Sequence, residues 1–127
     1  ILPQQFQQLF SNLIINSIKY SKDGVPPQIA ITTEHAADEE IRLLGGNPEL
    51  EYIKILVADN GIGFNDVQSE KIFEAFFRLH GKDKIRGSGL GLALCKKIVD
   101  NHNGFIRASG KEGEGATIKI YIPSKTI

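Results

Sequence analysis

Two kinds of apolar periodicity alternate along this chain of 127 residues, and their order is the feature that most constrains its fold. Apolar residues at helical spacing mark residues 3–20 and the stretch that follows the glycine-rich residues 87–91. Alternating and β-branched patterns predict strands at residues 28–33, 51–59, 105–109 and 116–122. This order favours one domain, residues 1–127, with an α/β layout in which helices cover one face of a sheet.

Two stretches between these elements have weaker patterns. In residues 36–50, the turn residues at 45–48 are clear, and the segments on either side of them are expected to pair as a hairpin. Residues 64–88 form a connection of about 25 residues, longer than compact domains usually contain without a functional reason. A short helical pattern within this connection carries phenylalanines on one side: Phe73, Phe76 and Phe77.

The overall composition excludes several classes of protein. Fifteen basic and fifteen acidic residues give a formal net charge of zero, which disfavours a nucleic-acid binder that relies on bulk electrostatics. A single cysteine, Cys95, excludes an internal disulfide and a cysteine-based zinc site, and we expect it to be a packing residue. The longest nearly apolar run, residues 53–58, is too short for a membrane span. Because the sequence contains no methionine, we expect it to be a piece of a longer protein.

The first helical segment carries a polar cluster beside its apolar stripe. Its members are spaced so that they line one face of the helix: Asn12, Asn16, Lys19 and Tyr20. An ordinary solvated surface is one interpretation. Asparagine, however, is a poor helix former, and two in adjacent turns cost about 1 kcal/mol relative to alanine. An amide oxygen aimed into a cleft is a suitable ligand for Mg²⁺, and Lys19 lies where it can meet a phosphate.

The most convincing strand runs directly into a polar turn with the sequence Asp59, Asn60, Gly61, Ile62 and Gly63. A strand that ends in a turn explains most such sequences, because these residue types are common in turns. Alternatively, a carboxylate at a strand end accepts a hydrogen bond from an exocyclic amine such as that of adenine. The glycines then remove side chains where a flat base approaches the backbone.

The second helical segment opens with Gly87, Gly89 and Gly91, but it contains neither a dinucleotide-binding nor a P-loop motif. A flexible hinge is one interpretation. An anion site is the other, because free N–H groups and the helix dipole attract negative charge at a helix start. Residues 78–86 add four basic side chains against one acidic side chain: Arg78, Lys82, Lys84 and Arg86 against Asp83. This local excess of positive charge suits a polyphosphate.

Together these clusters resemble the ATP-binding catalytic domain of sensor histidine kinases, in the GHKL or Bergerat-fold superfamily. The motifs similar to the family's N, G1, F and G2 boxes and to its closing motif are, in order, residues 9–20, 59–64, 73–78, 87–92 and 115–117. The run from Arg78 to the G2 box is most similar to phytochrome-type kinases. The resemblance implies a two-layer α+β sandwich with residues 64–88 as the ATP lid. Its mixed, mainly antiparallel sheet would be covered on one face by about three helices.

The resemblance also implies roles for individual residues. Asn16 would coordinate Mg²⁺ with Asn12 in support, and Tyr20 would lie near the sugar or base. Asp59 would bind the adenine N6 amine, with Thr117 beside it through water. Phosphates would be held by Lys19 and by Arg78 or another basic residue of the lid. The base pocket and the gate over the triphosphate would be formed by Gly61, Ile62, Gly63, Gly87, Ser88, Gly89, Leu90 and Gly91.

The implied activity is that of a protein-histidine kinase, which transfers the γ-phosphoryl group of Mg·ATP to a histidine on a separate dimerisation domain of the same parent. A response-regulator receiver domain would accept the phosphate next. The parent would be a homodimer, soluble or membrane-anchored, and this domain would be cytoplasmic, without contact to nucleic acid or membrane. None of His35, His80 and His102 fits the family's phosphoacceptor, which lies on a helix and is followed by an acidic residue.

Two alternatives stay open at this point. Relatives that hydrolyse ATP carry a glutamate one helical turn before the magnesium-binding asparagine, where it activates water as a general base. Here that position is Asn12, which disfavours a GHKL ATPase clamp because an amide does not accept a proton at neutral pH. A non-catalytic ATP sensor or docking module is the second alternative.

Residues 36–50 are also longer than the family's usual hairpin.

Overall fold

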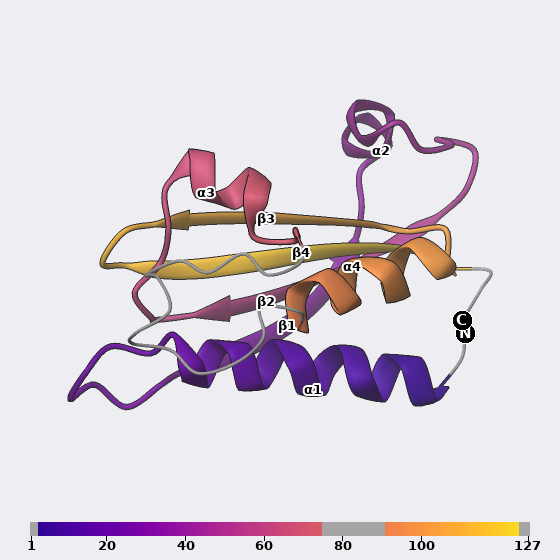
Figure 1. The fold of residues 1–127 in the computed structure, drawn as a ribbon. Coiled ribbons are helices and arrows are strands. Elements are labelled where there is room, and N and C mark those ends of the chain that lie inside the picture. Colours follow the sequence, from indigo (N-terminus) through magenta and orange to yellow (C-terminus); the bar gives the residue numbers. More distant parts are fainter. Residues whose placement is uncertain (1–2, 75–90, 125–127) are drawn as a thin grey trace.

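The computed structural model describes residues 3–74 and 91–124, which form a four-stranded sheet with helices packed against it (Figure 1). The strand order is β1-β2-β4-β3, and all three pairings of the described strands are antiparallel, which confirms the expected mainly antiparallel α+β architecture. None of the described helices is both long and apolar enough to cross a membrane. In chain order the elements are α1 (Pro3–Lys19), β1 (Ile29–His35), α2 (Asp38–Leu44), β2 (Tyr52–Asp59), α3 (Asp66–Lys71), α4 (Gly91–Asn101), β3 (Phe105–Lys111) and β4 (Gly115–Pro123).

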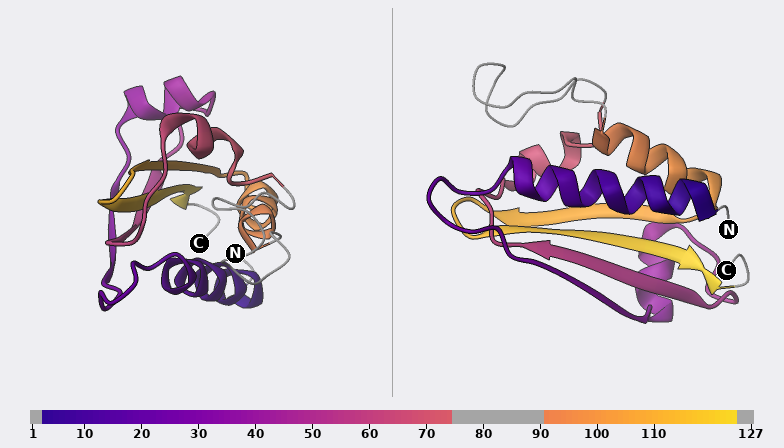
Figure 2. Two further views of the ribbon diagram at one scale, coloured as in Figure 1. Left: turned by 60° about the vertical axis from the view of Figure 1, so that its left-hand side comes forward. Right: turned by 90° about the horizontal axis from the view of Figure 1, so that it is seen from below.

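The main core lies between the sheet and a helical layer in which α1 and α4 pack against each other (Figures 1 and 2). α1 buries Leu9, Leu13 and Ser17, because positions four residues apart lie on the same face of a helix. α3 contacts β3, and Ile72, directly after α3, joins the same core. The inward-facing residues of α4 and of three strands complete the core: Cys95, Ile98, Val99, Ile55, Val57, Ile106, Ile118, Ile120 and Ile122.

The expectation that residues 36–50 form a hairpin is wrong, because they contain the helix α2. Gly45 ends this helix in the left-handed conformation, at φ 86°, so the glycine-rich stretch is a helix end followed by a turn. Ile41 is the buried residue of α2 and packs with Tyr52 and Tyr121. Tyr121 alternates with inward-facing residues of β4, so α2 covers part of the second face of the sheet. Figure 2 shows α1 and α2 on opposite sides of the strands.

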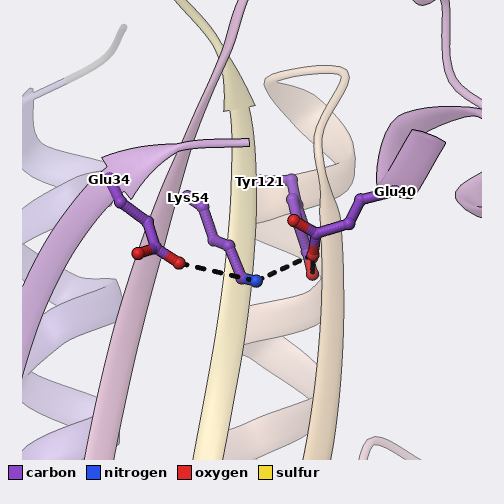
Figure 3. Close-up of polar contacts among 4 residues, drawn as sticks. All are labelled: Glu34, Glu40, Lys54 and Tyr121. Carbon is purple, nitrogen blue, oxygen red and sulfur yellow. Dashed lines mark hydrogen bonds and ion pairs between the residues drawn. The ribbon is translucent and has the colours of Figure 1, made fainter. Parts of the chain in front are cut away.

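A charged cluster attaches α2 to this second face (Figure 3). Lys54 Nζ lies 2.7 Å from Glu40 Oε2 and 3.6 Å from Glu34 Oε1. The Tyr121 hydroxyl group donates a hydrogen bond of 2.9 Å to the same oxygen of Glu40. The hydrogen bond between Lys54 and Glu40 raises the pKa of the lysine and lowers the pKa of the glutamate. Each charge of this cluster therefore has its partner within the protein.

Candidate functional site

A hollow lies beside the C-terminal part of α1, where it meets the end of β2 and the start of β4. Its polar side chains are Asn16, Ser17 and Tyr20, from α1 and the residue after it, and Asp59 from the end of β2. The structure therefore brings together Asn16, Tyr20, Asp59 and Gly63, which the sequence predicts from two separate motifs. The remaining lining is mostly apolar: Leu13, Gly63, Phe64, Ile72, Leu92, Ala116 and Ile118.

Three hydrogen bonds fix the Asp59 carboxylate at this end of β2. Its Oδ1 accepts from the backbone N–H groups of Gly61 at 3.0 Å and Ala116 at 3.2 Å. Its Oδ2 accepts from the Ser17 hydroxyl group at 3.1 Å. The β2–β4 register explains the contact with β4, because Asp59 lies opposite Ala116. All three donors are neutral, and Oδ2 retains a lone pair for a further donor.

The glycines that follow β2 are required by the backbone packed around the hollow. A Cβ atom on Gly61 would approach the Tyr20 carbonyl oxygen to 2.5 Å, and that carbonyl also accepts a hydrogen bond from the Ile62 N–H at 2.9 Å. Gly63 has a left-handed φ of 69°, and a Cβ atom there would collide with the Lys111 carbonyl. The groups that leave no room for a side chain are thus parts of the protein backbone itself.

Asn12 lies one helical turn before Asn16, but it does not line the hollow. Its amide Nδ2 is buried and has no hydrogen-bond partner among the described residues. The side chain lies next to Cys95 of α4. Burial raises the pKa of this thiol to about 12. Cys95 is therefore an unreactive packing group, and Asn12 belongs to the contact between α1 and α4.

Thr117 does not line the hollow, whereas its neighbours Ala116 and Ile118 do. Successive side chains of a strand point to opposite faces of a sheet, so Thr117 points away from the main core. A contact of Thr117 with a base, even through water, does not fit this register. The aliphatic hydroxyl group beside Asp59 belongs to Ser17 instead.

The other expected site residues are outside the hollow or outside the described part of the chain. Lys19 is the last residue of α1, and Gly91 is the first residue of α4, as its glycine-rich start predicts. Neither of them lines the hollow, and Ile62 does not either, although Leu92 does. Five expected site residues lie outside the described residues: Arg78, Gly87, Ser88, Gly89 and Leu90.

The motif patterns do not point to Ser17, but a signal for it exists. Leu9, Leu13 and Ser17 follow one another at intervals of four residues, so a hydroxyl group occupies a position of the buried stripe of α1. A polar group at such a position needs a hydrogen-bond partner. The sequence therefore identifies Ser17 as unusual, and only the fold identifies Asp59 as its partner.

The hollow suits a flat, largely apolar ligand that offers a hydrogen-bond donor to Asp59. In the part of the chain that the structure describes, no group of three or more His, Cys, Asp or Glu side chains could hold a metal ion. Asn16 supplies an amide oxygen beside the hollow, which is the type of ligand that Mg²⁺ prefers. Among the described residues, this amide oxygen therefore fits a magnesium ion that arrives with phosphate oxygens and water.

Comparisons with known proteins identify the family of the chain. Residues 1–126 match the family described as "Histidine kinase-, DNA gyrase B-, and HSP90-like ATPase". Cyanobacterial phytochrome A of Nostoc sp. (strain PCC 7120) is 42% identical over 119 residues, which are 94% of this chain and 14% of the phytochrome. Sensor protein kinase WalK of Staphylococcus aureus is 36% identical over 130 residues, covering 98% of this chain and 28% of that kinase. The chain thus spans a small part of these relatives.

Solved structures share the fold. The mycobacterial sensor histidine kinase MprB has a TM-score of 0.74 at 23% identity, over 94% of this chain and 72% of that one. The catalytic domain of histidine kinase ThkA, in a nucleotide-free form, has a TM-score of 0.66 at 27% identity, over 94% of this chain and 66% of that one. Since the family match extends over nearly all residues, the chain belongs to the histidine kinase-, DNA gyrase B- and HSP90-like ATPases.

Proposed function

We propose that this chain is the ATP-binding catalytic domain of a sensor histidine kinase and that it transfers the γ-phosphoryl group of ATP to a histidine on a separate dimerisation domain. Membership of an ATPase family implies nucleotide binding, and the kinase relatives favour transfer to a protein. The observation that carries the proposal is Asp59, a carboxylate held by neutral donors at the wall of an apolar hollow.

In this proposal each polar residue binds a different part of the nucleotide. Asp59 accepts a hydrogen bond from the adenine N6 amine, and Tyr20 lies near the sugar or base. Asn16 would coordinate Mg²⁺ through its amide oxygen, while Lys19 and Arg78 would bind phosphate oxygens. When bound, Mg²⁺ would neutralise phosphate charge and help to orient the γ-phosphoryl group. The chain's own residues contribute orientation and charge neutralisation and form no covalent intermediate.

The phosphoacceptor is placed on another domain because the described histidines do not suit the role. His102 is 5% exposed, stacks edge-on with Phe6 at a centroid distance of 4.9 Å, and has Nδ1 2.8 Å from the Ile98 carbonyl. His35 ends the strand β1 and does not lie on a helix. His80 lies outside the described residues. A histidine-bearing dimerisation domain of a homodimeric parent and then a response-regulator receiver domain are the proposed partners.

Asn12 distinguishes this proposal from an ATPase that hydrolyses its nucleotide. A general base must accept a proton from water, and an amide does not do so at neutral pH. Asn12 also lies against α4 and does not line the hollow. Both facts favour transfer of the phosphoryl group to an external nucleophile over hydrolysis.

Phosphotransfer between separate polypeptides tests the proposal. The chain is mixed with magnesium, γ-labelled ATP and the separately produced histidine-bearing domain of its parent. We expect acid-labile label on that domain, and no label when its acceptor histidine is replaced by alanine. Asn16→Asp is expected to retain nucleotide binding and to lose metal-dependent transfer, because it alters the group proposed to orient the metal.

Each other result favours a different function. ATP binding without any phosphohistidine would favour a sensing or docking module. Rapid steady-state release of phosphate by the chain alone would favour an ATPase clamp. No heat of binding with millimolar ATP, in a sample whose circular dichroism shows a folded protein, would contradict nucleotide binding altogether.

A further inference from the structure

Ser17 places a hydroxyl group where the apolar stripe of α1 otherwise places a hydrocarbon. It is 7% exposed, follows the buried Leu13 by four residues, and also lines the hollow. Its Oγ lies 3.1 Å from Asp59 Oδ2, so it connects α1 to the end of β2 at the point where a ligand would bind. A buried hydroxyl group needs a hydrogen-bond partner, and Asp59 is that partner.

The direction of this hydrogen bond decides what the pair offers to a ligand. An ionised carboxylate only accepts, so the proton between the two oxygens is that of the Ser17 hydroxyl group. The Ser17 oxygen is then left with lone pairs alone. Asp59 Oδ1 is already occupied by the N–H groups of Gly61 and Ala116, and Oδ2 has one accepting position left. Toward the hollow, Ser17 and Asp59 therefore present acceptors and no donor.

A purine nucleotide meets this arrangement through the substituent on carbon 6. An amino group on carbon 6 donates a hydrogen bond to Asp59. A keto oxygen on carbon 6 instead faces the acceptor oxygens of Ser17 and Asp59, which repel it. If Ser17 turned its proton toward a keto oxygen, it would break a hydrogen bond to a charged carboxylate, which is stronger than a bond between neutral groups. The arrangement therefore favours 6-amino purines.

We propose that Ser17 is a positioning residue for nucleotide selectivity: by holding Asp59 and committing its own proton to it, Ser17 makes the hollow prefer 6-amino over 6-keto purine nucleotides. The inference rests on the proposed function, because it places the base of the nucleotide beside Asp59. It adds to that function a residue that acts through Asp59 and sets the ratio between two ligands.

Ser17→Ala, measured with Mg·ATP and Mg·ITP by titration calorimetry, tests this role. In the variant a water molecule can take the place of the hydroxyl group, donating one proton to Asp59 and the other to a keto oxygen. We expect ATP to bind about fivefold more weakly, the effect of one hydrogen bond. We also expect the preference for ATP over ITP to fall by about threefold or more, because only the keto nucleotide gains a donor.

Two further variants serve as controls. Ser21→Ala removes the same group from a residue that does not line the hollow, since Ser21 Oγ donates to the Ile18 carbonyl at 2.7 Å. It should leave both affinities unchanged. Ser17→Thr keeps the hydroxyl group and should keep the preference for ATP, with folding checked by thermal denaturation. In an Asp59→Asn background, Ser17→Ala should no longer change the ratio, because Ser17 acts through the carboxylate.

The outcomes separate this inference from the function on which it rests. An unchanged ratio in Ser17→Ala, or equal losses for ATP and ITP, would overturn the inference and leave nucleotide binding intact. A change of ratio that persists in the Asp59→Asn background would also overturn it, because Ser17 would then act without Asp59. Failure of the unaltered chain to bind either nucleotide would instead remove the proposed function, and the inference with it.

Discussion

Two carboxylates on opposite faces of the same sheet are both held in place, but by different kinds of partner. Glu40, in α2, pairs with the ammonium group of Lys54 and accepts a hydrogen bond from Tyr121 (Figure 3). Asp59, at the end of β2, is held by two backbone N–H groups and the Ser17 hydroxyl group. In the part of the chain that the structure describes, the charged pairs include Glu40 but not Asp59.

This difference distinguishes an attachment from a binding site. A carboxylate that is paired with a lysine already has a strong partner within the protein. Glu40 is such a carboxylate, and its pairing with Lys54 holds α2 against the sheet. A carboxylate held only by neutral donors has a fixed position and an unused accepting position, which is the condition for binding an external donor. A fixed carboxylate alone therefore does not identify a binding site. A fixed carboxylate that also has an unused accepting position does.

The largest expected effect is that of Asp59→Asn on nucleotide affinity. Oδ1 of the asparagine can still accept from the two backbone N–H groups, so its Nδ2 has to face the donor of the ligand. We expect ATP to bind about tenfold to a hundredfold more weakly, the effect of a hydrogen bond to a charged group. Calorimetry measures the affinity, and thermal denaturation checks that the variant is folded. Unchanged affinity would remove Asp59 from the proposed adenine site.

Glu40→Gln tests the other side of the comparison through stability. ATP affinity should stay within about twofold, while the free energy of unfolding at neutral pH should fall by up to about 1 kcal/mol, since the pair is partly exposed. The hydrogen bond with Lys54 lowers the pKa of Glu40 in the folded protein. The stabilising effect of the ionised Glu40 is therefore complete above the ordinary pKa of 4.5, and it is lost as the pH falls through the lowered pKa. Urea denaturation at pH 7 and at a pH well below 4.5 should therefore show the difference from the unaltered chain shrinking in acid. A difference that grows in acid would contradict the pairing.

The sequence predicts the long elements of this fold and misses α2, the short helix on the second face. α1, β2 and α4 show apolar periodicity over many residues, and the structure confirms all three. α2 has seven residues and buries one of them, Ile41, which is too few to define a period. The glycine that ends α2, Gly45, is also the residue type that marks a hairpin turn, so composition alone favours the wrong element there.

The site shows the same limit at the level of single residues. Asn16 and Asp59 could be singled out because each belongs to a short motif that the resemblance to the kinase family marks, and the structure brings them together at the hollow. The role of Ser17 depends on a partner 42 positions away in the sequence, and no local pattern reveals such a contact. Thr117 fails for a different reason, because a motif does not show to which face of the sheet a strand residue points, and a shift of one residue reverses it.

The smallest expected effect is that of Thr117→Val, and its value lies in the comparison with its neighbour. Valine has nearly the shape of threonine and suits a strand, so stability should change by less than about 0.5 kcal/mol and ATP affinity by less than about twofold. Ala116→Val places two extra methyl groups on the lining of the hollow and should weaken ATP binding measurably. Titration calorimetry on both variants compares adjacent residues on opposite faces of one strand. If valine weakens binding at 117 and not at 116, the side of β4 assigned to the hollow is reversed, and Thr117 returns as a candidate contact of the base.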